Sequence, residues 1–393
     1  MYIILLGMIA CFTYTLTQAP FSEFLNSSNI SYTFAPLLAF PYFLRFCWDK
    51  PLYKIFSKLN RKFLHKEMLI GLSLILLSSA TLLLMDVIAW YVHAIIFTIV
   101  GASQENVIES YKITVKKESN QQTTWYLFGY RGSKIIVSPF IYFVTGLLTT
   151  YSSYVSYCLA FVILSLFIAV FSIVFYFVAE DTTEYESKLS ILDIKDLRQV
   201  FLAIKEKQTF VIFFNTVLFR FADSMVSSVF LIFLFEFISS VEYASKGVFM
   251  GVLSLLGLVI AYYCKVNLKI HIKNLLLVTG TIQTLTFLLF IFLIETPMQV
   301  IVSCILFKIF AIFSTDVIAT YMRSNAGYTT GYKQSAYILS ESFYRLFSCV
   351  AGFLGSLLYY YTSHNTFFLV CFIVSTIPTI VFLKYRNRIL AIY

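Results

Sequence analysis

The chain has 393 residues, of which 59% are hydrophobic and only 12% are charged, and its mean hydropathy is +0.82. A soluble domain carries about twice that charged fraction, so the composition excludes an ordinary soluble globular protein. The formal net charge of +9 is spread over the stretches between apolar runs. It therefore indicates orientation in a membrane and argues against a nucleic-acid-binding surface.

Apolar runs long enough to cross about 30 Å of hydrocarbon recur along the whole chain. Together they predict an all-α polytopic membrane protein with twelve transmembrane helices. In chain order, the predicted spans lie near residues 2–18, 30–47, 67–85, 88–111, 123–148, 154–178, 209–238, 244–263, 275–294, 298–322, 335–361 and 367–384.

The basic residues orient these spans. With a cytoplasmic N-terminus, 22 of the 29 Lys and Arg residues fall on cytoplasmic segments, and only Lys246 falls on an external loop. This asymmetry is the positive-inside pattern. It predicts a multi-pass protein with both termini in the cytoplasm.

The longest predicted loop, residues 180–208, separates two groups of six spans. Its apolar residues recur at near-helical spacing, which predicts an amphipathic helix on the membrane surface. The expected organisation is an N-terminal six-helix bundle at 1–179, a cytoplasmic linker at 180–208 and a C-terminal six-helix bundle at 209–393. This is the layout of the major facilitator fold.

A weak internal repeat supports two related halves. The pairs Tyr130-Arg131 and Tyr344-Arg345 are 214 residues apart, and each opens an apolar run that ends in Gly, Leu-Leu and Tyr. Paired halves are typical of secondary transporters, which bind their solute near the membrane midplane between the halves.

Ionisable side chains interrupt several spans, and each costs about 2.5–3.5 kcal/mol at the centre of a membrane helix. We therefore expect them to face a cavity or one another. The predicted substrate or proton pathway comprises Gln104, Glu105, Glu109, Tyr130, Arg131, Arg220, Asp223, Gln334, Glu341 and Arg345. The predicted gate or structural charges are Arg45, Asp49 and Lys112.

Two interpretations of these charges stay open. They could be ion pairs that hold helices together, or they could bind solute and carry protons. Glu105, Glu109 and Lys112 share one face of the fourth span at spacings of four and three residues. Glu109 and Lys112 lie near the interface and favour the structural role, whereas the deeper Glu105 favours a cavity lining.

The sequence does not favour a membrane-embedded enzyme. None of the four histidines has a carboxylate four or five residues downstream, and the seven cysteines include no CxxC pair. No nucleophile elbow or Walker loop is present either. We therefore expect no enzymatic activity, no cofactor and no metal site.

Five segments follow one family pattern, in order along the chain. They are "PYFLRFCWDKPLY" at 41–53, "SQENVIESYK" at 103–112, "LFGYRGS" at 127–133, "LFRFADSM" at 218–225 and "KQSAYILS" at 333–340. They resemble the AmpG-type muropeptide permeases, major-facilitator proteins related to the acetyl-CoA transporter family. The second segment resembles the Ser-Gln-Asp-x-x-x-Asp-Ala-x-Lys signature of that family, with Glu105 and Glu109 at the aspartate positions.

The resemblance implies a monomeric, proton-coupled importer of anhydro-muropeptides in the bacterial inner membrane, serving cell-wall recycling. Its solute would be an anionic sugar-peptide, and membrane lipid and protons would be its other partners, with no nucleic acid. The chain departs from the pattern by carrying Glu for Asp at two positions and by a shifted register between Trp48 and Lys54. The alternative is therefore a diverged paralogue that carries another organic anion or a nucleotide-like metabolite.

Overall fold

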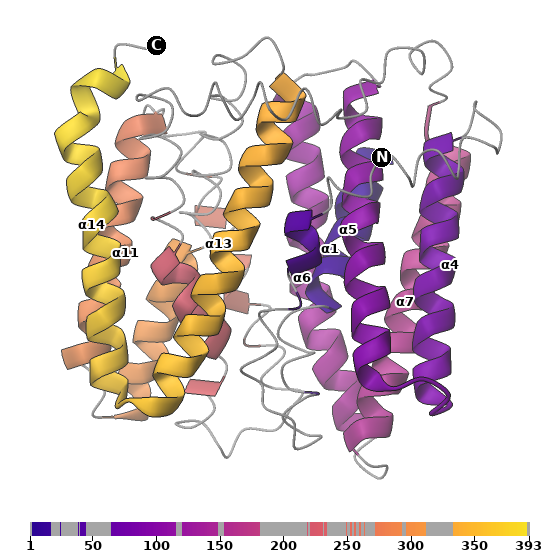
Figure 1. Cartoon of the computed structure of the whole chain (residues 1–393), viewed down its shortest axis with the longest axis horizontal. Helices are drawn as coiled ribbons and strands as arrows, with labels where there is room; N and C mark the ends of the chain where they lie inside the picture. Colours follow the sequence, from indigo (N-terminus) through magenta and orange to yellow (C-terminus); the bar gives the residue numbers. More distant parts are fainter. Residues whose placement is uncertain are drawn as a thin grey trace. The chain divides into compact units, whose positions relative to one another are not determined.

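The computed structural model describes part of the chain, and every regular element in that part is a helix (Figure 1). The described residues are 2–16, 24, 38, 40–44, 64–114, 120–147, 153–180, 218, 221–230, 232–233, 249, 252–253, 255–256, 259–260, 263, 272–292, 296–311 and 333–390.

The chain divides into two compact units, each considered separately below. The first unit comprises Met1–Leu192 with Glu242–Val252, and the second comprises Asp193–Val241 with Leu253–Tyr393. The predicted linker at 180–208 lies outside the described residues apart from Glu180. Its amphipathic helix stays a prediction.

Long helices make up most of the described residues of both units. Those of the first unit are α1 (Tyr2–Leu16), α4 (Leu64–Leu84), α5 (Trp90–Thr114), α6 (Asn120–Leu147) and α7 (Ser153–Val178). Those of the second are α11 (Ile272–Phe292), α13 (Lys333–Tyr361) and α14 (His364–Leu390), beside helical segments at 221–230 and Pro297–Ala311. The ends of these eight labelled helices differ from the predicted spans by at most six residues.

Four helical stretches among the described residues are long and apolar enough to cross a membrane: Leu64–Leu84, Tyr154–Val178, Ser342–Tyr361 and His364–Val381. Their outward faces are apolar. Along α7, the exposed residues Leu166, Val170, Ile173 and Phe177 recur every three or four positions. Water would penalise such a stripe, whereas lipid would solvate it, so these faces are built for contact with a bilayer.

Helix ends are set by local hydrogen bonds that the apolar pattern does not reveal. At the end of α4, the Val87 N–H donates to the Leu82 carbonyl at 2.9 Å and the Asp86 N–H donates to the Leu83 carbonyl at 3.0 Å. Asp86 has a φ of 57°, which completes a Schellman motif. This motif ends α4 and starts the short turn that leads into α5.

The helix Pro297–Ala311 begins with a capping box. The Thr296 N–H donates to the Gln299 side chain at 3.0 Å, and the Gln299 N–H donates to the Thr296 hydroxyl at 3.3 Å. The pair satisfies two backbone donors that a helix start otherwise leaves open, and Pro297 at the first helical position has no donor to satisfy.

The first unit is held by close pairs of helices, chiefly α1 with α6 and α4 with α5 and α7 (Figure 1). Two glycines bring α1 and α6 together. A methyl group at Gly7 would meet the Tyr126 carbonyl oxygen, and one at Gly129 would meet the Ile4 carbonyl oxygen. Small residues at such crossings let helix backbones approach closely in a bilayer.

In the second unit, α11 packs along α14, and aromatic rings fill the space between them. Phe290 of α11 stacks on Phe368 of α14 at a centroid distance of 4.5 Å. Phe233 contacts both rings edge-on, at 5.6 Å and 5.1 Å respectively. These contacts connect Phe233, three residues beyond the helical segment 221–230, to the α11–α14 pair.

Candidate functional site

The predicted site residues of α5 lie inside the first unit. Gln104 is 0% exposed and Glu105 is 8% exposed, while Glu109, one turn further along, is half-buried. α5 continues past Lys112 to Thr114, but the Lys112 side chain is not among those described. The expected pair between Glu109 and Lys112 therefore stays a prediction.

Gln104 connects four helices through a chain of buried hydrogen bonds. The Thr13 hydroxyl on α1 donates to Gln104 Oε1 at 2.7 Å, and Gln104 Nε2 donates to Ser73 Oγ on α4 at 2.9 Å. Ser73 Oγ in turn lies 2.8 Å from Ser172 Oγ on α7. These four side chains, here called the Gln104 network, tie α1, α4, α5 and α7 together inside an apolar bundle.

The surroundings of Gly101 show which way Glu105 points. Gly101 precedes Glu105 by one helical turn, so the two lie on the same side of α5. A methyl group at Gly101 would lie 2.5 Å from the Tyr42 hydroxyl and 2.8 Å from Cγ2 of Thr13. The side of α5 that carries Glu105 therefore packs tightly, one turn away, against α1 and Tyr42.

The α1–α6 crossing also positions Tyr130. This side chain is half-buried and stacks on Tyr126 at a centroid distance of 6.3 Å. Its neighbour Gly129 contacts the backbone of Ile4. The glycine of the predicted Gly-Tyr-Arg segment thus has a packing role, because it lets α1 approach the turn of α6 that carries Tyr130.

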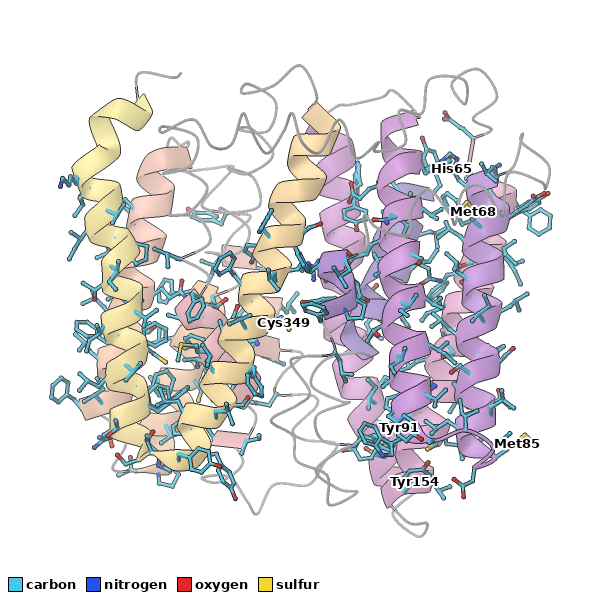
Figure 2. All side chains as sticks on the ribbon, in the orientation of Figure 1. His65, Met68, Met85, Tyr91, Tyr154 and Cys349 are labelled. Atoms are coloured by element: carbon cyan, nitrogen blue, oxygen red, sulfur yellow. The ribbon has the colours of Figure 1, made fainter. Side chains whose placement is uncertain are left out.

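A second polar cluster lies at the end of α4 that is marked by His65 in Figure 2, away from the end marked by Met85. The buried Lys66, 5% exposed, donates to the Ala179 carbonyl at 2.5 Å, and the Tyr111 hydroxyl donates to the Glu180 carbonyl at 3.0 Å. Both carbonyls follow the last turn of α7. A cation and a hydroxyl thus satisfy acceptors that a helix C-terminus otherwise leaves open.

In the second unit, Asp223 is 1% exposed and lies in the helical segment 221–230. Two residues further on, the segment packs against α13, because a methyl group at Gly355 would lie 2.6 Å from Cα of Met225. The Ser356 hydroxyl also donates to the Ser228 hydroxyl at 3.2 Å. Arg345, which lies ten residues before Gly355 on α13, is half-buried.

The remaining predicted residues are placed in part or not at all. The side chains of three of them are not described, although their backbones lie in α6 and α13: Arg131, Gln334 and Glu341. Three others lie outside the described residues altogether: Arg45, Asp49 and Arg220. Their roles stay predictions.

Sequence reasoning did not single out Thr13, Ser73 and Ser172, and it counted Lys66 among the cytoplasmic loop cations. The one available signal was a small polar residue recurring inside otherwise apolar spans. That signal is weak, because Ser and Thr in membrane helices often bond only to their own helix. Ser73 bonds both to its own helix and to its neighbours, since its hydroxyl also lies 2.7 Å from the Leu69 carbonyl.

Within the described residues, no group of three or more His, Cys, Asp or Glu side chains is arranged to hold a metal ion. The five described cysteines are buried. The polar groups that the structure brings together are hydroxyls, an amide and single charges. Such groups can bind a polar solute or exchange a proton.

The chain matches no protein-family model and no curated protein sequence. Its arrangement of helices is nevertheless similar to solved transporters. A variant of the nucleoside transporter NupG superposes with a TM-score of 0.71 at 13% identity, covering 98% of both chains. A structure from work on proton-dependent oligopeptide transporters gives 0.69 at 12% identity, covering 98% of this chain and 99% of that one.

A D-xylose–proton symporter gives a TM-score of 0.67 at 10% identity, covering 96% of this chain and 95% of that chain. The chain has the major facilitator fold. The predicted fold class, an all-α polytopic membrane protein with the major facilitator fold, is therefore confirmed. Counted along the chain, α1, α4, α5, α6 and α7 fall on predicted spans 1, 3, 4, 5 and 6.

Proposed function

We propose that the chain is a secondary active transporter that imports anhydro-muropeptides together with protons by alternating access. The fold supports a transporter, because structures similar to it over nearly their whole length carry nucleosides, oligopeptides or D-xylose according to their titles. Two of those titles also name proton coupling or proton dependence.

The observation that carries the proposal is a buried carboxylate inside each unit. Glu105 on α5 and Asp223 in the segment 221–230 are 8% and 1% exposed. An acid inside a span costs about 2.5–3.5 kcal/mol, and such residues mark substrate or proton pathways in membrane proteins. In a protein whose two halves rock about a central site, either acid can take up a proton on one side and release it on the other.

The solute is proposed from the motifs. Glu105 and Glu109 occupy the acidic positions of the segment that resembles the AmpG-type permeases. The peptide of an anhydro-muropeptide carries carboxylates, and guanidinium groups bind carboxylates through paired hydrogen bonds. We assign this role to Arg131, Arg220 and Arg345, with Tyr130 as a ring on which the sugar can stack.

The same proposal covers organisation and location. The N-terminal bundle would occupy 1–179, the linker 180–208 and the C-terminal bundle 209–393. The protein would be a monomer in the bacterial inner membrane with both termini in the cytoplasm. Arg45, Asp49 and Lys112 would form part of its cytoplasmic gate.

Uptake of radiolabelled anhydro-muropeptide tests the proposal, in cells that lack their own permease and express this chain, with and without a protonophore. We expect accumulation that the protonophore removes. Accumulation that resists the protonophore would refute proton coupling. An absence of uptake, with the protein verified in the membrane, would refute the solute, and a panel of organic anions and nucleotides would then test the alternative.

A further inference from the structure

Gln104 is a predicted pathway residue whose surroundings point to a different role. Both atoms of its amide group that can form hydrogen bonds are used inside the first unit, one by Thr13 and the other by Ser73. With 0% of its surface exposed, the side chain is enclosed by helices. A solute could reach this amide only if the bundle itself came apart.

The direction of the hydrogen bonds also argues against proton transfer. The Thr13 hydroxyl donates to the amide oxygen at 2.7 Å and also lies 3.0 Å from the Ile9 carbonyl, and the amide nitrogen donates to Ser73. The Leu69 carbonyl can only accept, so the 2.7 Å contact takes the Ser73 proton, and Ser172 then donates to Ser73. The chain therefore ends at a backbone carbonyl, and none of its four side chains titrates.

The network instead determines how α5 is rotated. The amide of Gln104 bonds to Thr13 on α1 and to Ser73 on α4, so it has one favourable rotation. Glu105 is the next residue and leaves the helix axis about 100° further round. Any rotation that strained the Gln104 network would turn Glu105 by the same angle.

We propose that Gln104 is a positioning residue. Its network holds α1, α4, α5 and α7 in one register and fixes the direction in which Glu105 points, without touching solute and without carrying a proton. This inference rests on the proposed function in one respect, because it takes Glu105 to be the acid that couples transport to protons.

The chain offers a matched control for this proposal. Ser79 also lies on α4, is also buried, and also bonds to α5, through His93 Nδ1 at 2.9 Å. His93 lies twelve residues before Glu105, which is about 18 Å along the helix. Ser79→Ala thus removes the same kind of α4–α5 bond at a distance from the acid.

The experiment compares Gln104→Leu, Ser73→Ala and Thr13→Val with Thr13→Ser, which keeps the hydroxyl, and with Ser79→Ala. Maximal uptake rate and half-saturating solute concentration are measured for each, together with thermal unfolding of the purified protein in detergent. We expect the three network variants to lower the maximal rate about tenfold or more, because misplaced reacting groups have effects of that size. The half-saturating concentration should stay within about twofold.

Thr13→Ser and Ser79→Ala should keep the wild-type rate. The double variant Gln104→Leu with Ser73→Ala should unfold at nearly the temperature of Gln104→Leu alone, since residues of one network are not additive. A raised half-saturating concentration in Gln104→Leu, with no rate loss in Ser73→Ala or Thr13→Val, would overturn the proposal in favour of solute contact. Equal rate losses in Ser79→Ala would overturn it in favour of general destabilisation.

The outcome separates this proposal from the proposed function. A wild-type protein that takes up no solute refutes the proposed function and, with it, the role for Glu105. The unfolding measurements do not depend on solute. Additive temperature shifts in the double variant would then refute the network itself.

Discussion

The two units join their corresponding helices through different kinds of interaction. In the first, span 4 reaches span 1 through an amide, because Gln104 accepts a hydrogen bond from Thr13 at 2.7 Å. In the second, the corresponding span 10 reaches span 7 through a cation, because Lys308 Nζ lies 5.1 Å from the centre of the Phe230 ring. Lipid provides little hydrophobic force between helices, so each unit needs specific contacts of one kind or the other.

The same contrast holds between spans 3 and 6 and their counterparts, spans 9 and 12. Ser73 and Ser172 join α4 to α7 at 2.8 Å, whereas the Thr284 hydroxyl reaches the Ser375 carbonyl of α14 only at 3.4 Å. The α11–α14 pair relies instead on stacked rings such as Phe290 on Phe368. Hydrogen bonds restrict the rotation of a helix about its axis more than contacts between rings do. The first unit is therefore better suited to hold the side chain of Glu105 in one direction.

The largest expected effect concerns the acids of the two units. We expect Glu105→Gln to abolish proton-coupled uptake while folding and membrane insertion stay intact, since the amide cannot exchange a proton. Asp223→Asn, the matched change in the second unit, should slow uptake but leave it sensitive to a protonophore. Normal accumulation by Glu105→Gln would remove this residue from the mechanism, and the coupling acid would have to be sought in the second unit.

The next largest effect concerns the helix crossings. In Gly129→Ala the new methyl group meets the backbone of Ile4, and backbone cannot move aside as a side chain can. We expect a loss of about 3 kcal/mol of stability or more, the upper end for overpacking, measured by thermal unfolding in detergent. Gly355→Ala should behave similarly in the second unit, because its methyl group would meet the backbone of Met225.

Gly132 provides the control for this crossing. It lies on the same helix as Gly129, and a methyl group there meets nothing within 4 Å. Gly132→Ala should therefore leave the unfolding temperature unchanged or raise it slightly. If Gly129→Ala were as stable as Gly132→Ala, the close α1–α6 approach would be wrong.

A smaller effect is expected at two lysines inside helices, the buried Lys66 and the half-buried Lys308. Lys66→Met removes a charged hydrogen bond to the end of α7 and should cost about 1.5–3 kcal/mol. Lys308→Met removes a cation from the Phe230 ring and should cost about 0.5–2 kcal/mol. Methionine keeps the apolar stem in both cases. Unfolding in detergent measures the difference, and a larger loss at Lys308 would reverse the proposed contrast between the units.

The smallest effect concerns the hydroxyls between corresponding helices. Ser73→Ala leaves the Gln104 amide without its acceptor and should cost about 1–2 kcal/mol, whereas Thr284→Val loses a long contact and should cost less than about 0.5 kcal/mol. The same unfolding assay measures both variants. Equal losses of stability would show that hydrogen bonds between helices contribute no more to the first unit than to the second.

Much of the fold could be predicted from the sequence, and part of the site could not. The eight labelled helices fall on eight predicted spans, since each run of apolar residues predicts a span without knowledge of its neighbours. The extended start of α14 was missed because it depends on a cap: the Thr366 N–H donates to the Ser363 hydroxyl at 3.4 Å. Serine at such a position predicts a helix start only weakly.

The buried acids Glu105 and Asp223 could be singled out from the sequence, because a charge within an apolar run is conspicuous whichever way it points. Their support was not found, because Gln104 meets Thr13 and Ser73 at separations of 91 and 31 residues. No local pattern states which residues of distant helices will face one another. The packing role of Gly129 was missed for the same reason.

The sequence by itself determined the fold class and the positions of the eight labelled helices, because the free energy of transferring a segment into lipid is close to a sum of contributions from its own residues. Tertiary structure alone decided which polar groups meet inside the bundle. That choice depends on how each helix is rotated and how closely it approaches its neighbours, and the contacts of Gly7, Gly129 and Gln104 set both in the first unit.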